Sequence, residues 1–132
     1  MKPVRQEDIL GCAVACVAFV LNINYGNAIK LFEHGTRKAR NKGFFCKDII
    51  LALKIASLRY EYKYIKSRLR RTIYNSYTIV YIKKSKKYPL GHYVVRFNNK
   101  WMDPWINFPD ANIQAGFRKR LPGKPIYAIY KA

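Results

Sequence analysis

The chain has 132 residues, which suits one domain with a single core over residues 1–132 and is too few for two ordinary domains. Half of the residues are apolar and 15% are aromatic, which excludes a disordered chain, and 26 Lys and Arg against 7 Asp and Glu give a net charge of +19. The three cysteines, an odd number, argue against a disulfide framework and are typical of a reducing compartment.

The longest uncharged run, Ile9–Ile29, does not have the length of a membrane span. Its apolar part ends near Leu21, and about 13 apolar residues are too few for a helix that needs about 20 to cross a bilayer. Glu7 and Asp8 precede this run, where a secretory signal would carry basic residues. We therefore expect a soluble, cytoplasmic protein that makes no membrane contact.

The first half of the chain predicts helices. Residues 12–23 are apolar almost without interruption, which indicates a helix buried on all sides. A short second helix is predicted over 26–34 and would end at Gly35. The basic segment 36–42 has no large apolar residue and is predicted to be a solvated loop, whereas the apolar spacing in 47–58 predicts a third helix.

The second half of the chain predicts strands. Tyrosines alternate with charged residues in 60–64, and segments 77–82, 93–97 and 125–130 are rich in β-branched and aromatic residues. Asn98-Asn99 separates two of these segments and suits a tight hairpin turn. Helices followed by antiparallel strands indicate an α+β domain in which N-terminal helices pack on an antiparallel sheet.

Three side chains far apart in the sequence have complementary chemistry. Cys12 stands at the start of the buried helix, where free N–H groups and the helix dipole favour a nucleophilic thiolate. If Asn98-Asn99 is a two-residue turn, Val94 lies opposite Asp103, and Asp103 comes within diagonal reach of His92. A three-residue turn would instead put Asp103 on the other face of the sheet. A carboxylate in this apolar setting needs a partner, which the imidazole supplies.

Several motifs follow one another in the order seen in a known family. Gln6 lies six positions before Cys12, Gly91-His92-Tyr93-Val94-Val95 forms the later histidine segment, and Asp103-Pro104 follows it. Together they resemble the bacteriocin-processing cysteine peptidases, which cleave double-glycine leaders. Gly43-Phe44-Phe45 also falls where the family has a comparable loop, so the resemblance covers about residues 6–106.

The resemblance implies a papain-like fold with a Cys–His–Asp triad. Our hypothesis is a stand-alone thiol protease that hydrolyses a peptide or isopeptide bond and uses no cofactor. Cys12 would attack the carbonyl, His92 would activate the thiol and protonate the leaving amine, and Asp103 would orient the imidazole. Gln6 would donate its side-chain amide to the oxyanion, together with the backbone N–H of Cys12.

The positions next to these residues are the candidate substrate-binding residues Gly11, Ala13 and Gly91. Gly11 stands where the family usually has an acidic residue, and Ala13 stands where it usually has glycine. The methyl group of Ala13 would lie near the path of the substrate backbone. These two departures also motivate a non-catalytic alternative on a disused peptidase fold.

The remaining cysteines have structural interpretations. Cys16 is predicted to belong to the core and Cys46 to be structural. His34 is predicted to be a helix C-terminal cap or a surface residue. A zinc site formed by Cys12, Cys16, His34 and Cys46 is an alternative, although its spacing is not that of a common zinc finger, and we expect no metal.

Basic residues recur in four clusters, over residues 37–42, 68–71, 83–87 and 118–124. Basic clusters between tyrosines can hold phosphates and stack bases, so the alternative function is a cationic binding protein for nucleic acid or an acidic protein. The more ordinary interpretation is that the clusters form the solvated surface of a cationic protein. They could also recruit an acidic peptide or protein substrate to the thiol.

Overall fold

The computed structural model describes residues 1–132 and contains four α-helices followed by six strands. The helices are α1 (Cys12–Leu21), α2 (Tyr25–Ile29), α3 (Gly35–Asn41) and α4 (Cys46–Ile55). The strands are β1 (Tyr60–Tyr64), β2 (Ile79–Ile82), β3 (His92–Phe97), β4 (Lys100–Asp103), β5 (Gly116–Arg118) and β6 (Pro125–Lys131). They form one antiparallel sheet in the order β1-β6-β2-β3-β4-β5, which confirms the α+β class.

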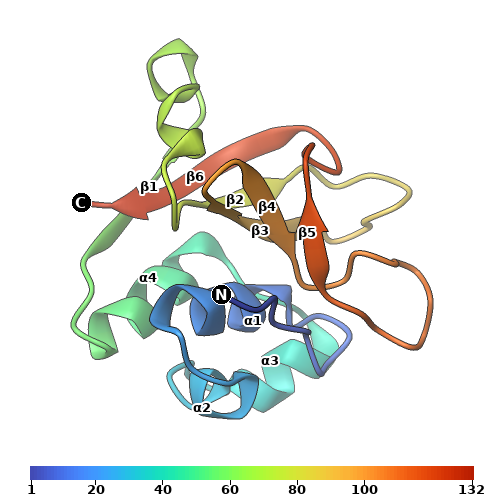
Figure 1. Ribbon diagram of the computed structural model, residues 1–132. Coiled ribbons are helices and arrows are strands. Elements are labelled where there is room, and N and C mark those ends of the chain that lie inside the picture. The colour runs from blue at the N-terminus through green and yellow to red at the C-terminus, as the bar shows by residue number, and fades with distance from the viewer.

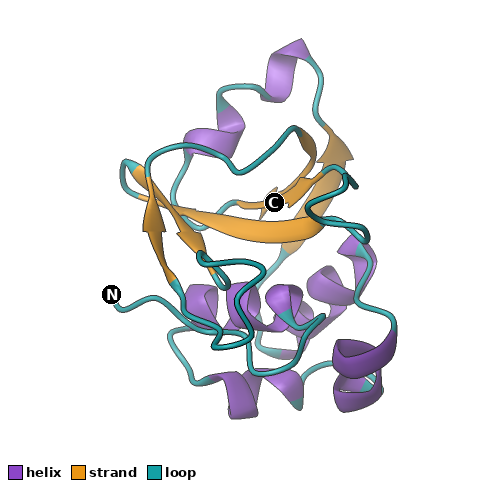
Figure 2. Cartoon of the chain, turned by 90° about the vertical axis from the view of Figure 1, so that its right-hand side faces the viewer, coloured by secondary structure: helices purple, strands orange, loops and turns teal.

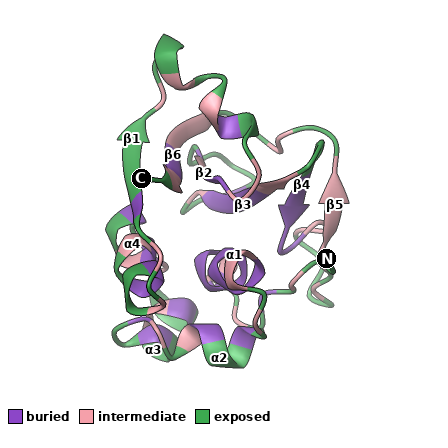
Figure 3. Ribbon diagram, turned by 60° about the vertical axis from the view of Figure 1, so that its left-hand side comes forward, coloured by how far each residue is buried: buried purple, intermediate pink, exposed green.

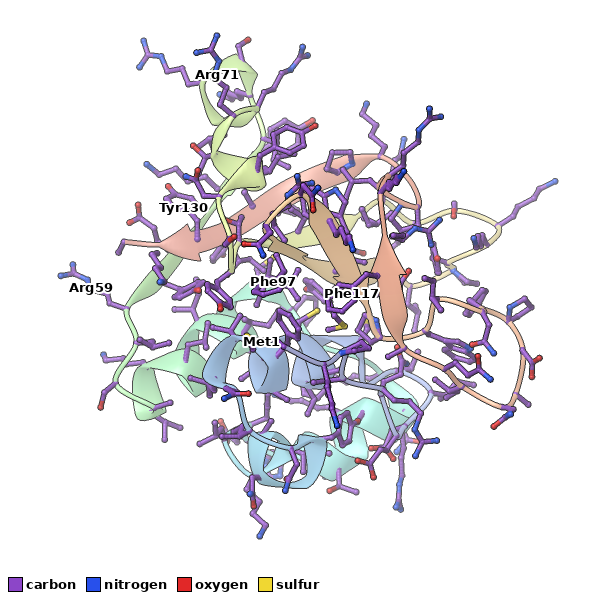
Figure 4. The ribbon with its side chains drawn as sticks, viewed as in Figure 1. Met1, Arg59, Arg71, Phe97, Phe117 and Tyr130 are labelled. Carbon is purple, nitrogen blue, oxygen red and sulfur yellow. The ribbon has the colours of Figure 1, made fainter.

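The four α-helices cover one face of the sheet (Figure 1). Figure 2 shows two short 3-10 helices, Ser67–Leu69 and Thr72–Tyr74, on the opposite side, where their segment projects away from the domain. Arg71 lies near the tip of this projecting segment (Figure 4). The core therefore has a large part between the helices and the sheet and a smaller part on the other face.

Helix α1 lies in the middle of the larger core (Figure 3). Residues 13–19 have no exposed surface, which explains why this segment is apolar on every side. Phe19 packs its ring edge-on against Phe97 of β3 and Phe117 of β5, at centroid distances of 5.4 and 6.1 Å. Although α1 is very apolar, neither it nor any other helix has both the length and the hydropathy for a membrane span.

The predictions for the segment 26–42 were only partly correct, since a short second helix forms over Tyr25–Ile29 but the expected end at Gly35 and the expected loop do not. Helix α2 ends at Ile29, and Gly35 begins a helix instead of ending one. The expected loop forms α3 because tertiary contacts stabilise it: Ala39 is fully buried, and its carbonyl accepts a 2.8 Å hydrogen bond from Leu10 N–H. His34 is an exposed residue at the N-cap of α3 and does not cap a helix C-terminus.

The hairpin between β3 and β4 has the predicted two-residue turn. Phe97 pairs with Lys100, and Val95 pairs with Met102, so the register continues toward Asp103 at the end of β4. Asn98 adopts a positive φ of 54°, which asparagine tolerates in tight turns. Strand β5, which adds to the edge of β4, has only three residues and was not predicted.

Candidate active site

The hairpin brings His92 and Asp103 into direct contact. His92 Nε2 lies 2.7 Å from Asp103 Oδ1, as the two-residue turn predicted. The contact is almost closed to solvent, since His92 is 4% exposed and Asp103 is fully buried. Both residues stand at strand ends, so the sheet fixes their backbones.

Two further groups hold the carboxylate of Asp103. Its Oδ1 also accepts a hydrogen bond from the backbone N–H of Trp105 at 3.0 Å, and its Oδ2 accepts one from Arg118 Nη1 at 3.1 Å. Burial alone would raise the pKa of Asp103, but His92, the Trp105 N–H and Arg118 outweigh it and lower the pKa. Asp103 is therefore held as a carboxylate. The sequence analysis assigns Arg118 only to the basic cluster 118–124. Its contact with Asp103 was not predicted, because nothing in the sequence indicates the short strand β5 that carries it.

Tyr88 is a second neighbour of the imidazole that the sequence did not identify. Its ring stacks on His92 with a centroid distance of 4.5 Å and an interplanar angle of 4°. Phe108 packs against the ring of Tyr88 at 5.0 Å. The stack fixes the plane of the imidazole. The only local signal in the sequence is that Tyr88 lies four positions before His92.

Cys12 and His92 line the same cavity. Cys12 is the first residue of α1 and is partly exposed, and Gly11 at the N-cap supplies no capping side chain that would compete for the free N–H groups. Because Nε2 of His92 binds Asp103, Nδ1 is the ring nitrogen left for the thiol. Burial disfavours imidazolium, but the interactions with Asp103 and Cys12 outweigh it and raise the pKa of His92 to about 9.

The other two cysteines are poor nucleophiles. Cys16 is fully buried in the core, as predicted, and burial raises its pKa well above the ordinary value. Cys46 touches the cavity, but burial raises its pKa to about 11. No group of three or more His, Cys, Asp or Glu side chains is placed to hold a metal ion, so the zinc alternative with His34 finds no support.

Gln6 lines the cavity, but the N–H groups of its amide are already used within the chain. Its Nε2 donates two 3.0 Å hydrogen bonds, to the backbone oxygens of Asp8 and Ile9. Its Oε1 is buried and accepts no hydrogen bond. The loop before α1 thus positions the side chain. To donate to a substrate, one of the two N–H groups would have to be shared between its backbone acceptor and the substrate oxygen.

The three candidate substrate-binding residues have different environments. Gly91 lines the cavity with φ +80°, and a Cβ there would overlap the ring of Tyr81. Gly11 is buried and does not line the cavity, contrary to the expectation, and a Cβ there would overlap the Tyr25 hydroxyl, so close packing explains the glycine. The expectation that the Ala13 methyl group lies near the path of the substrate was wrong. This methyl group is fully buried in the core and does not line the cavity.

The cavity has a volume of about 760 Å³ and lies between the helices and one end of the sheet. Gly43-Phe44-Phe45, the loop noted in the sequence, forms part of its wall. Most of the lining is apolar or aromatic, and the polar groups include Gln6, Cys12 and His92. An apolar cavity with a few convergent polar groups is typical of a binding site.

Protonation of His92 predicts a pH dependence of stability. Because its pKa is raised from 6.5 to about 9, the imidazolium stabilises the folded state fully below pH 6.5, and this contribution disappears as the pH rises toward 9. The free energy of unfolding in urea should therefore fall between about pH 6.5 and 8.5. The same titration with His92→Gln should lack this part of the slope; an equal slope in both proteins would contradict the prediction.

A search of solved structures finds a similar fold in the peptidase domain of ComA from Streptococcus, a bifunctional ABC transporter involved in a quorum sensing pathway. The TM-score is 0.57 and the sequence identity is 25%, over 99% of this chain and 97% of that one. The chain has a papain-like peptidase fold. No protein-family model matches the sequence, and no curated protein matches it significantly. The papain-like fold predicted from the motifs is therefore confirmed through structural similarity.

Proposed function

We propose that this chain is a cysteine peptidase of the bacteriocin-processing type, which hydrolyses a peptide or isopeptide bond. The observation that carries the proposal is the buried 2.7 Å contact between His92 and Asp103 beside the cavity that Cys12 also lines. Similarity to a peptidase domain over nearly the whole chain supports the same reaction class.

The reaction would proceed in two halves. Cys12 gives its thiol proton to His92 Nδ1 before attack, and Asp103 stabilises the resulting imidazolium through Nε2. The Cys12 thiolate then attacks the carbonyl carbon. The negative oxygen that forms is stabilised by the Cys12 N–H at the helix N-terminus and by a shared Gln6 N–H. His92 then gives its proton to the leaving amine, and a thioester remains. Water, deprotonated by His92, hydrolyses the thioester and restores the thiol.

Thiol labelling tests this proposal directly. We expect iodoacetamide at pH 6 to alkylate Cys12 selectively in the native protein, because Cys16 and Cys46 are buried and act as internal controls. His92→Gln should slow the labelling at least about tenfold, since the thiolate loses its imidazolium partner. Peptide mapping by mass spectrometry measures both rates.

Cleavage of a degenerate fluorogenic peptide library should parallel the labelling. Wild type should release fluorescence and Cys12→Ala should not, whereas Cys16→Ala, which lies outside the cavity, should retain activity. Equal labelling of Cys12 in wild type and His92→Gln, together with no Cys12-dependent cleavage, would exclude the proposed reaction.

A second proposal is a binding role for the positive charge. Lys63, Lys66 and Arg68 surround a separate cavity of about 610 Å³ next to the projecting segment. Affinity for heparin or single-stranded DNA that falls steeply with salt and survives Cys12→Ala would favour this role. Absence of binding at low salt would exclude it.

A further inference from the structure

Two basic clusters that are distant in the sequence meet at the cavity. Lys42 follows α3 in the helical layer, and Lys84 follows β2 in the sheet, yet both line the cavity that Cys12 and His92 share. Both lysines are exposed and neither forms an ion pair within the chain. The cavity is therefore flanked by positive charge from two sides.

No acidic residue offsets this charge in the cavity wall. None of the lining residues is Asp or Glu. Two acids near the helical side are already neutralised: Asp8 pairs with Arg40 at 3.4 Å, and Asp48 pairs with Lys38 at 3.2 Å. Lys42 and Lys84 thus remain available to a carboxylate that enters from outside.

The same cavity exposes large apolar side chains. Ile9 is 62% exposed, Phe45 is 70% exposed and Leu90 is 48% exposed, and all three line the cavity. Tyr81 and Tyr127 add aromatic surface to the wall. Clustered apolar side chains that remain exposed at a concave site indicate an apolar ligand group.

From this arrangement we propose that Lys42 and Lys84 are specificity-determining residues, which select a substrate peptide with carboxylates next to the bulky apolar side chains that enter the cavity. The inference deepens the proposed peptidase function and rests on it. Exposed ion pairs add modest affinity, but they accelerate encounter and reject basic peptides. Selectivity would therefore be salt-dependent, while the apolar contacts supply most of the binding.

Binding can be measured apart from cleavage. A degenerate decapeptide library without cysteine is passed over immobilised Cys12→Ala at about 50 mM and about 300 mM NaCl, and the retained peptides are sequenced. We expect Asp or Glu next to Phe, Tyr, Leu or Ile to be enriched at low salt. Replacing the acids of the best peptide by Gln or Asn should weaken its binding about fivefold or more.

Matched variants test where the selectivity arises. In the Cys12→Ala background, Lys42→Gln/Lys84→Gln should abolish the preference for the acidic peptide. Arg70→Gln/Arg71→Gln removes the same charge from the projecting segment on the other side of the sheet and should preserve the preference (Figure 4). No enrichment of acids, or an equal loss of preference in both double variants, would overturn the inference.

The two proposals fail differently. If the selected peptide binds Cys12→Ala but wild type does not cleave it, the peptidase function fails and the recognition stands. If wild type cleaves the acidic peptide and its Gln/Asn counterpart at equal kcat/KM, the peptidase function stands and the inference about substrate class fails.

Discussion

Replacement of Asp103 by alanine is expected to lower kcat/KM by a factor of about 10²–10⁴, because the imidazole loses the group that fixes its orientation and stabilises its charged form. The same change should destabilise the fold by about 2–4 kcal/mol. It leaves the Trp105 N–H without its buried acceptor and Arg118 without its carboxylate partner.

Asparagine at the same position should expose the role of Arg118. In Asp103→Asn, the side-chain oxygen can still accept from His92 and the Trp105 N–H, but the amide nitrogen then faces the guanidinium of Arg118, which is also a donor. We expect Asp103→Asn to lose most of its activity and Asp103→Asn/Arg118→Gln to recover part of it. The glutamine oxygen can accept from the new amide.

Steady-state kinetics and urea unfolding of these variants measure both effects. Asp110→Asn is the matched control, since Asp110 is exposed and its carboxylate contacts only the backbone of the next turn. Its activity should stay close to that of wild type. The account of the site would be wrong if Asp103→Ala kept full activity, and the role of Arg118 would be wrong if the second substitution brought no recovery.

Replacement of Gly91 by alanine should have a large effect for the addition of a single methyl group. Gly91 adopts φ +80°, which strains any L-residue, and the added Cβ would overlap the Tyr81 ring. The Tyr81 hydroxyl cannot yield freely, because it donates a 3.0 Å hydrogen bond to Leu90 O. We expect a loss of about 3 kcal/mol in the free energy of unfolding.

The strain would also act on the reaction, because His92 is the next residue along the chain. Displacement of the imidazole from Asp103 should lower kcat at least about tenfold beyond any loss of folded protein. Gly26→Ala is the control. Gly26 lies in α2 without a positive φ, and a Cβ there meets only Asn24 Oδ1 at 3.6 Å, so stability should be equal or slightly higher. Thermal and urea unfolding of the two variants compare them.

Local patterns in the sequence were sufficient for several features. The uninterrupted apolar run predicts α1 because a helix buried on all sides needs no polar face. The Asn98-Asn99 turn fixed the register of β3 and β4, and with it the contact between His92 and Asp103. These predictions succeeded because the period of a strand and the length of a turn decide which side chains share a face.

Long-range contacts decided the features that were not predicted, namely α3 and the neighbours of His92 and Asp103. No local sequence pattern encodes such contacts. Helix α3 forms although its sequence is basic, because Ala39 is buried against the loop before α1. Arg118 reaches Asp103 only because a three-residue strand joins the edge of β4, and Tyr88 covers His92 only through the turn before β3. The sequence by itself therefore identified the candidate reacting groups and their order along the chain. The tertiary structure decided which residues hold these groups, Arg118 and Tyr88, and which charges surround the cavity. Both depend on segments that meet only after folding.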